Sequence, residues 1–237
     1  MFSRARSKVI AAGVAAVVIG SGSYGIVAAT SSDAATTTTA SSSHPFAGGS
    51  GSGASGSNAR SGPAAGGAVG TVSSVSASGF TLTTSGSQKV TIKEASSTTY
   101  ENGTSQASAS AVTAGESALV LGTTDSTTIT ASEVIVNPPS SSGTNPGGQV
   151  IPYSKGESGS TQQVGQIPSD YSPGSGTIVS GTTADKATEA ALAAYPGGVV
   201  DRVVAIGNGD YEVHYTGVNW PHHIFVNQDF QVIGAND

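Results

Sequence analysis

The chain has 237 residues, of which 10% are charged, 5% are aromatic and 33 are glycine. A single core of this length would need more large apolar side chains, so we expect small folded units separated by disordered segments. The net charge of −6 gives no global electrostatic reason to bind nucleic acid, and the lack of cysteine excludes disulfides and thiolate metal sites.

The N-terminus is predicted to be a signal peptide or a membrane anchor over residues 1–30. Basic residues between positions 4 and 8 precede an uncharged run over residues 9–30, which is long enough to span a bilayer. Small side chains at residues 27–29 offer a cleavage site. We expect an exported protein, extracellular or in the cell envelope, with the membrane as a partner if the segment is not cleaved.

Residues 31–67 are predicted to be a disordered tether. They are mostly Ser, Thr, Gly and Ala, and side chains of this kind cannot offset the entropy that is lost when a chain is ordered. The tether contains His44, one of the four histidines, and we expect its side chain to be solvated.

Residues 68–137 are predicted to form a small all-β domain. Five short runs have strand character, and apolar residues alternate with polar ones in Phe80-x-Leu82 and in Val90-x-Ile92. Turn residues separate the runs. Five short strands favour a barrel or a sandwich, because closure protects the edges of a sheet.

Short motifs in the same residues match one known family: Gly70-x-Val72-x-x-Val75, Phe80-x-Leu82, Val90–Ile92 and Gly115 ahead of Leu119–Gly122. They resemble an uncharacterised bacterial envelope family, known as a domain of unknown function, whose members are OB-like barrels. The resemblance implies an OB-like barrel. Two lysines and two aromatic residues are too few for a nucleic-acid platform, so we expect a structural module and no nucleic acid as a partner.

Residues 138–180 are predicted to be a second disordered linker, because Pro, Gly and Ser dominate them. This stretch is expected to have no core of its own. Its isolated larger side chains, Tyr153, Ile167 and Tyr171, can dock on a neighbouring domain.

Residues 181–237 are predicted to form a helix followed by an antiparallel sheet. The stretch from Thr182 to Tyr195 has small apolar residues on one face, and Pro196–Gly198 ends it. Asn208–Gly209 between two apolar runs favours a hairpin, and two further β runs follow. We therefore expect an α+β unit in which the helix packs on three or four antiparallel strands.

Several motifs in this C-terminal stretch match a second family: Ala190–Leu192, Tyr195–Gly198, Val200, Val203, Tyr211–His214, Val226, Asp229, Phe230, Val232 and Gly234. They resemble a PepSY domain, a small module of bacterial secreted and membrane proteins. The resemblance implies a non-catalytic module that regulates peptidases or binds other envelope proteins. Residues 218–223 depart from the family, which is expected to have a short polar turn there.

No catalytic residue is expected in this chain. Serine is abundant, but no G-x-S-x-G or G-x-G-x-x-G run lies between a predicted strand and a predicted helix. The sequence also has no P-loop and no H-E-x-x-H motif. We therefore expect a protein that is not an enzyme.

Histidines near the C-terminus form a candidate site for Zn²⁺ or Cu²⁺, the only cofactors that the sequence suggests. The candidate ligands are His214, His222 and His223, with Glu212 or Asp229. Adjacent side chains of a strand point to opposite faces, so His222 and His223 both reach one ion only if Pro221 kinks the chain.

The alternation in residues 211–215 favours a plainer interpretation. Tyr211, Val213 and Tyr215 share one face, which we expect to lie toward the helix. Glu212 and His214 would then lie on the outer face of the sheet.

A third hypothesis concerns an exposed aromatic surface that binds a peptide or a glycan. Tyr211, Tyr215 and Trp220 could form it, because Tyr and Trp combine an apolar body with a polar tip. The alternative is that Trp220 packs over the open end of the sheet as part of the core.

The sequence thus predicts a non-enzymatic envelope protein with an OB-like barrel and a PepSY-like unit on disordered linkers. Its expected role is to bind or regulate another envelope protein, such as a peptidase. Metal binding and peptide or glycan binding are the two alternatives.

Overall fold

The computed structural model of the protein describes residues 62–139 and 162–237, which belong to one compact unit. The predicted signal or anchor segment, His44 and the tether up to residue 61 lie outside the described residues, as does Tyr153. Within the two described ranges, no helix is long and apolar enough to cross a bilayer.

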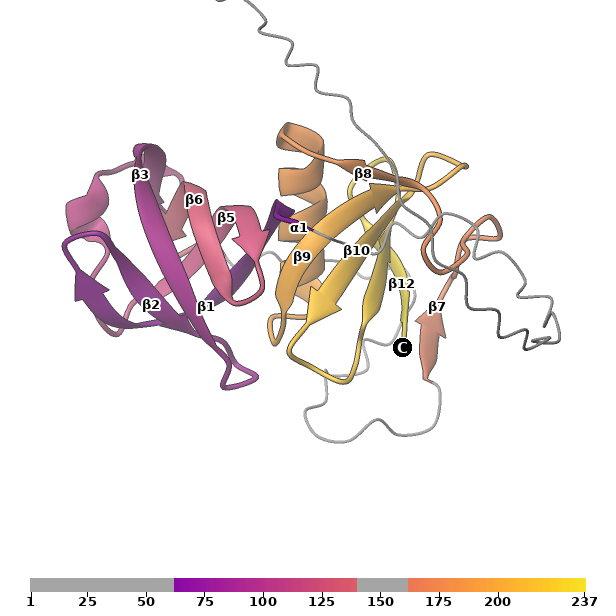
Figure 1. Cartoon of the computed structure of the whole chain (residues 1–237), viewed down its shortest axis with the longest axis horizontal. Helices are drawn as coiled ribbons and strands as arrows, with labels where there is room; N and C mark the ends of the chain where they lie inside the picture. Colours follow the sequence, from indigo (N-terminus) through magenta and orange to yellow (C-terminus); the bar gives the residue numbers. More distant parts are fainter. Residues whose placement is uncertain (1–61, 140–161) are drawn as a thin grey trace, which may run out of the picture. The chain divides into compact units, whose positions relative to one another are not determined.

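The first described range forms a closed barrel of five strands (Figure 1). The strands are β1 (Ala64–Ser76), β2 (Gly79–Thr83), β3 (Lys89–Asn102), β5 (Ser117–Asp125) and β6 (Thr128–Val136). They pair in the order β1-β2-β3-β6-β5 and back to β1, with β3 and β6 parallel and the other pairs antiparallel. Between β3 and β5 lie the short strand β4 (Ser105–Gln106) and the single 3₁₀ turn η1 (Ala109–Ala111).

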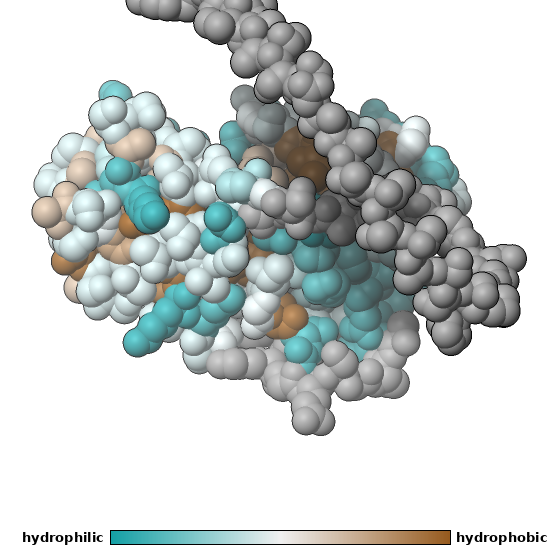
Figure 2. All heavy atoms as spheres, viewed as in Figure 1, coloured by the Kyte–Doolittle hydropathy of each residue, from teal (hydrophilic) through white to brown (hydrophobic). Residues whose placement is uncertain are grey.

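The barrel core follows from the alternation of side chains along each strand. Alternate residues of β2 and β3, such as Leu82, Val90 and Ile92, are buried in one apolar cluster. The residues between them are mostly Ser, Thr and Lys and face outward, which agrees with the mostly pale face of the barrel in Figure 2. The barrel expected for residues 68–137 is therefore present as a closed five-stranded barrel.

The second described range adds one α-helix and six strands. The helix is α1 (Thr182–Ala194), and the strands are β7 (Gln163–Gly165), β8 (Thr177–Val179), β9 (Val199–Ala205), β10 (Tyr211–Thr216), β11 (His223–Val226) and β12 (Val232–Asn236). The strands β9, β10, β11, β12 and β7 pair in that order, and β8 pairs with the other side of β9.

The barrel and the C-terminal strands form one sheet, because β1 also pairs with β9. The pairing joins Gly67 and Ala68 to Val200 and Val199. Gly66 makes this close approach possible, since a Cβ there would collide with the backbone oxygen of Val200.

A second junction lies at the turn between β2 and β3. The hydroxyl groups of Thr84 and Ser85 each donate a hydrogen bond of 2.9 Å, to the backbone oxygens of Gly197 and Pro196. The two described ranges are thus joined by side chains as well as by the sheet.

The expected fold class is wrong. The described residues are mostly strand, with a single α-helix, and they do not form an OB-like barrel followed by a separate α+β unit with a helix on three or four strands. The strands β9–β12 instead continue a twelve-stranded sheet, which β7 and β8 extend. The difference arises from pairings between residues far apart in the chain, which local periodicity does not report.

The helix α1 begins after Gly181, which has a φ of 67°, and no side chain caps its N-terminus. It presents small buried residues, Ala184, Ala187 and Ala191, and it packs with Leu192 against the sheet. Small side chains allow a close approach of helix and sheet. The apolar face of β9–β12 is thereby buried.

The other face of β9–β12 is covered by residues 162–180, which we call the strap. The strap contains β7 and β8, and the loop between them carries Tyr171. The ring of Tyr171 packs edge-on against Phe225 of β11, with centroids 4.7 Å apart. Tyr171, in a stretch that the sequence predicts to be a disordered linker, thus docks on the face of the sheet away from the helix.

Candidate metal centre

The strap-covered face of β9–β12 carries three histidines that lie close together. His214 lies in β10, opposite His223 at the start of β11, and His222 lies in the connection just before it. The backbone N–H of Tyr215 donates to the oxygen of His222, which holds that connection against β10. One potential ligand atom from each histidine lies within 4.8 Å of the other two.

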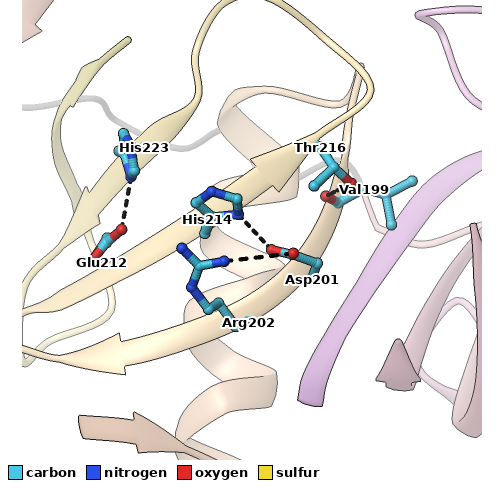
Figure 3. Close-up of polar contacts among 7 residues, drawn as sticks. All are labelled: Val199, Asp201, Arg202, Glu212, His214, Thr216 and His223. Carbon is cyan, nitrogen blue, oxygen red and sulfur yellow. Dashed lines mark hydrogen bonds and ion pairs between the residues drawn. The ribbon is translucent and has the colours of Figure 1, made fainter. Parts of the chain in front are cut away.

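Two of these histidines are held by carboxylates (Figure 3). Nδ1 of His214 lies 2.6 Å from Oδ1 of Asp201, and Nδ1 of His223 lies 2.7 Å from Oε1 of Glu212. A carboxylate can only accept, so Nδ1–H donates in both pairs. In the neutral tautomer, the lone pair is then on Nε2, which is free to bind a metal ion.

Asp201 reaches His214 because β9 contains a β-bulge. His214 is opposite Arg202 and Tyr215 is opposite Val200, so Asp201 is the extra residue between them. A bulge can re-aim side chains, and Asp201 and Arg202 both lie beside His214 (Figure 3).

The carboxylates are deeply buried. Glu212 is 1% exposed and Asp201 is 6% exposed. Nη1 of Arg202 lies 3.6 Å from Oδ2 of Asp201. Buried carboxylates beside the imidazoles would offset part of the charge of a bound dication.

His222 differs from its two neighbours because, among the described residues, no carboxylate is hydrogen-bonded to its ring. Burial, and then the nearby His214 and His223, lower the pKa of His222 from 6.5 to about 4. The ring centroid of His222 lies 4.3 Å from that of His214 and 4.7 Å from that of His223. At neutral pH, His222 is therefore a neutral imidazole packed edge-on against two others.

Tyr171 of the strap lies over the histidine cluster. Its ring centroid lies 5.7 Å from that of His223, and its buried hydroxyl has no hydrogen-bond partner in the described residues. Burial and the charge of Glu212 raise the pKa of Tyr171, while Arg202 lowers it. The hydroxyl of Tyr171 is thus protonated at neutral pH, and its pKa responds to the charges of Glu212 and Arg202.

Three imidazoles are a donor set that suits Zn²⁺ and Cu²⁺. Zinc binds imidazole nitrogen at about 2.0 Å, which places the nitrogens of a tetrahedral site about 3.3 Å apart. The spread of up to 4.8 Å must therefore shorten on binding. One coordination position would remain for water or another ligand.

The structure brings some of the predicted site residues together and leaves others apart. His214, His222 and His223 are brought together, and Glu212 supports His223. Asp229 is exposed in the turn between β11 and β12 and is not in the cluster. Glu212 and His214 lie on the face away from the helix, as expected, and both are buried there.

The aromatic residues proposed for an exposed surface do not form one. Trp220 is 1% exposed and lies in the apolar core on the helix side. Tyr215 is also buried, and its hydroxyl donates to the backbone oxygen of Tyr195 at 2.6 Å. Tyr211 is half-buried and stacks on Phe230. Trp220 is part of the core, as the alternative interpretation expected.

Sequence reasoning missed Asp201, Arg202 and the role of Tyr171. One signal was available: a charged pair interrupts the apolar run from Val199 to Ala205. Val200 and Val203 are three residues apart yet both face the helix, which indicates a bulge at the charged pair.

Comparisons of the chain with protein families, with curated proteins and with solved structures find no match.

Proposed function

We propose that this protein binds one late first-row transition metal ion, Zn²⁺ or Cu²⁺, through Nε2 of His214 and His223 and a ring nitrogen of His222. The observation that carries the proposal is that two of these histidines donate Nδ1–H to buried carboxylates. Carboxylates in this position orient metal-binding imidazoles and raise their basicity.

A purely structural role would explain only part of this arrangement. Histidine–carboxylate pairs on their own account for His214 and His223, as buried polar groups need partners. They do not account for His222, which is packed against both rings and is held by no carboxylate. A shared ion gives all three imidazoles a common partner.

We propose a non-enzymatic role for this site in an exported or membrane-tethered protein. The composition of residues 1–30 supports export. The regulation of an envelope peptidase by a PepSY-like region stays a prediction from the motifs in residues 181–237.

The proposal is tested by thermal unfolding of the full chain with and without Zn²⁺ or Cu²⁺. At a metal concentration of about 100 times the Kd, we expect Tm to rise by about 5–10 °C. His222→Ala should abolish the rise, and this variant breaks no side-chain hydrogen bond to a carboxylate. His44→Ala is the matched control and should keep the rise.

The test uses the full chain because β9 pairs with β1 of the barrel. The absence of a metal-dependent rise would overturn the proposal. An equal rise in the His222→Ala variant would place the ion elsewhere, with the same consequence.

A further inference from the structure

An open groove of about 580 Å³ lies beside α1, on the side of the molecule formed by the barrel strands and the helix. Its volume is in the range of pockets that bind small molecules or side chains of a peptide. The lining residues come from β1, β5 and β6, from the chain just after β6, from α1 and from the turn before β12. The histidine cluster is not part of it.

The floor of the groove is apolar. It contains Leu119 and Ile135 from the outer face of the barrel and Leu192 from α1. Pro139 and Ala193 are exposed at its sides. The floor residues are themselves mostly buried, with Leu119 and Ile135 each 8% exposed, and solvent meets the groove mainly at its apolar sides. An apolar groove that is open to solvent is a common feature of sites that bind another chain.

One rim of the groove is acidic. Glu189 of α1 lines the groove, and Asp185 lies one helical turn before it. Across the groove, Glu133 lies two residues before Ile135 on the same face of β6, and Glu101 of β3 is paired opposite Ile135. Burial is the largest cause that raises the pKa of Glu189, and the three neighbouring carboxylates raise it further. No ion pair joins any of these four carboxylates to a cation within the described ranges.

The one lysine that lines the groove does not neutralise this rim. Nζ of Lys186 lies 5.4 Å from the ring centroid of Phe230, in a cation–π contact. Lys186 lowers the pKa of Glu189, but this is the smallest of the influences on that group. The acidic rim thus keeps an excess of negative charge.

We propose that this groove binds a segment of a partner protein in which aliphatic or aromatic side chains lie next to lysine or arginine. The apolar side chains would fill the floor over Leu119 and Ile135, and the basic side chains would pair with Glu133 and Glu189. This surface is separate from the metal site, and the inference does not depend on metal binding.

Charge complementarity favours such a partner over a second copy of this chain. The chain carries 15 acidic residues against 9 basic ones, so a second copy would bring mainly negative charge to an acidic rim. A basic segment would relieve the repulsion among the four carboxylates.

The test measures binding of fluorescent peptides to the full chain by anisotropy. The probe is a short peptide of alternating leucine and lysine, and the controls replace lysine with glutamate or leucine with serine. We expect the leucine–lysine peptide to bind at least about tenfold more tightly than either control.

Two variants locate the binding site. Ala193→Trp fills the groove from the exposed side of α1 and should weaken binding about tenfold or more, whereas Ala77→Trp, in the exposed turn between β1 and β2, should not. Glu133→Gln with Glu189→Gln should weaken binding about threefold, and Asp229→Asn is the control for charge. Tm is measured for each variant to confirm that it folds.

Three kinds of result would overturn the proposal. The first is binding without the expected specificity, which means equal binding of the serine–lysine peptide or binding that Ala193→Trp leaves unchanged. The second is a dimer of the chain that Ala193→Trp dissociates. The third concerns residues 149–155, which contain apolar residues and Lys155. If the peptide binds only after these residues are replaced by glycine and serine, this segment of the chain itself would be the occupant of the groove.

Discussion

The two faces of β9–β12 are made by the same alternating strands but are buried in different ways. The helix face carries apolar residues such as Val203, Val213 and Ile224, which need no partner beyond close packing. The strap face carries His214, His223 and acidic residues, each of which needs a hydrogen bond when buried. The apolar face therefore accounts for stability, and the polar face is where a ligand can act.

The difference also lies in what covers each face. The helix α1 covers one face with alanine and leucine, whereas the loop of the strap between β7 and β8 covers the other with Tyr171. Burial of the polar face leaves Oε2 of Glu212 and Nε of Arg202 without a hydrogen-bond partner in the described residues. Buried polar atoms without partners are costly, which marks this face as the less optimised one for stability.

The largest expected effect comes from the helix face. Ile224→Ala removes a fully buried side chain from the apolar cluster and should lower the free energy of unfolding by about 2–5 kcal/mol. The metal affinity of the folded protein should stay unchanged. Denaturant unfolding and metal titration check the two parts, and a large loss of metal affinity would show that the faces are not independent.

The second effect comes from the carboxylates of the strap face. Asp201→Ala removes the acceptor of His214 Nδ1–H and should lower metal affinity about 10- to 100-fold. Asp201→Asn keeps an acceptor oxygen and should have a smaller effect. Calorimetric titration with Zn²⁺ measures both, and equal affinities for all three proteins would contradict the proposed role of Asp201.

A smaller effect is expected at Tyr171. Tyr171→Phe keeps the edge-on contact with Phe225 and removes a buried hydroxyl that has no hydrogen-bond partner in the described ranges. The variant should therefore change the free energy of unfolding by less than about 1 kcal/mol. Tyr171→Ala should cost more, because it also removes the ring. Equal losses for the two variants would show that the hydroxyl, rather than the ring, holds the strap.

The smallest effect concerns the pH dependence of stability and involves Glu133, which lies outside the histidine cluster. Burial, and then Glu101 and Asp185, raise the pKa of Glu133 above 4.5, so the folded state holds this proton more tightly than the unfolded state. The stability contribution of the protonated form is present below pH 4.5 and is lost as pH rises through the folded pKa. Glu133→Gln should therefore stabilise the protein at neutral pH by about 0.5 kcal/mol, since solvent screens this partly exposed group.

The check is the difference in Tm between Glu133→Gln and the parent protein at several pH values. The difference should shrink as pH falls below 4.5, where the parent carboxyl is protonated as well. A difference that is constant with pH would mean that the variant acts by packing and not by charge.

The barrel could be predicted from the sequence because its signal is local. Phe80, Leu82, Val90 and Ile92 alternate with polar residues, and that period places them in the core. The junction with the C-terminal strands could not be predicted this way. It depends on a pairing of Gly67 with Val200, far along the chain, and glycine carries no side-chain pattern.

The candidate site could be predicted only in part, for a related reason. The three histidines and Glu212 stand out in a chain with few such residues. Asp201 was missed because a bulge in β9 shifts the alternation by one residue and brings its side chain to His214. The strap was missed because β7 and β8 have three residues each and no apolar period.

The most direct measurement is X-ray absorption spectroscopy at the zinc edge on the full chain loaded with one equivalent of Zn²⁺. Binding through His214, His222 and His223 predicts three imidazole nitrogens at about 2.0 Å, with one further light ligand. The three-imidazole shell should be lost in the His222→Ala variant, while His44→Ala should leave the spectrum unchanged. A shell of oxygen ligands without imidazole scattering, or a spectrum that His222→Ala does not alter, would contradict a three-histidine metal site.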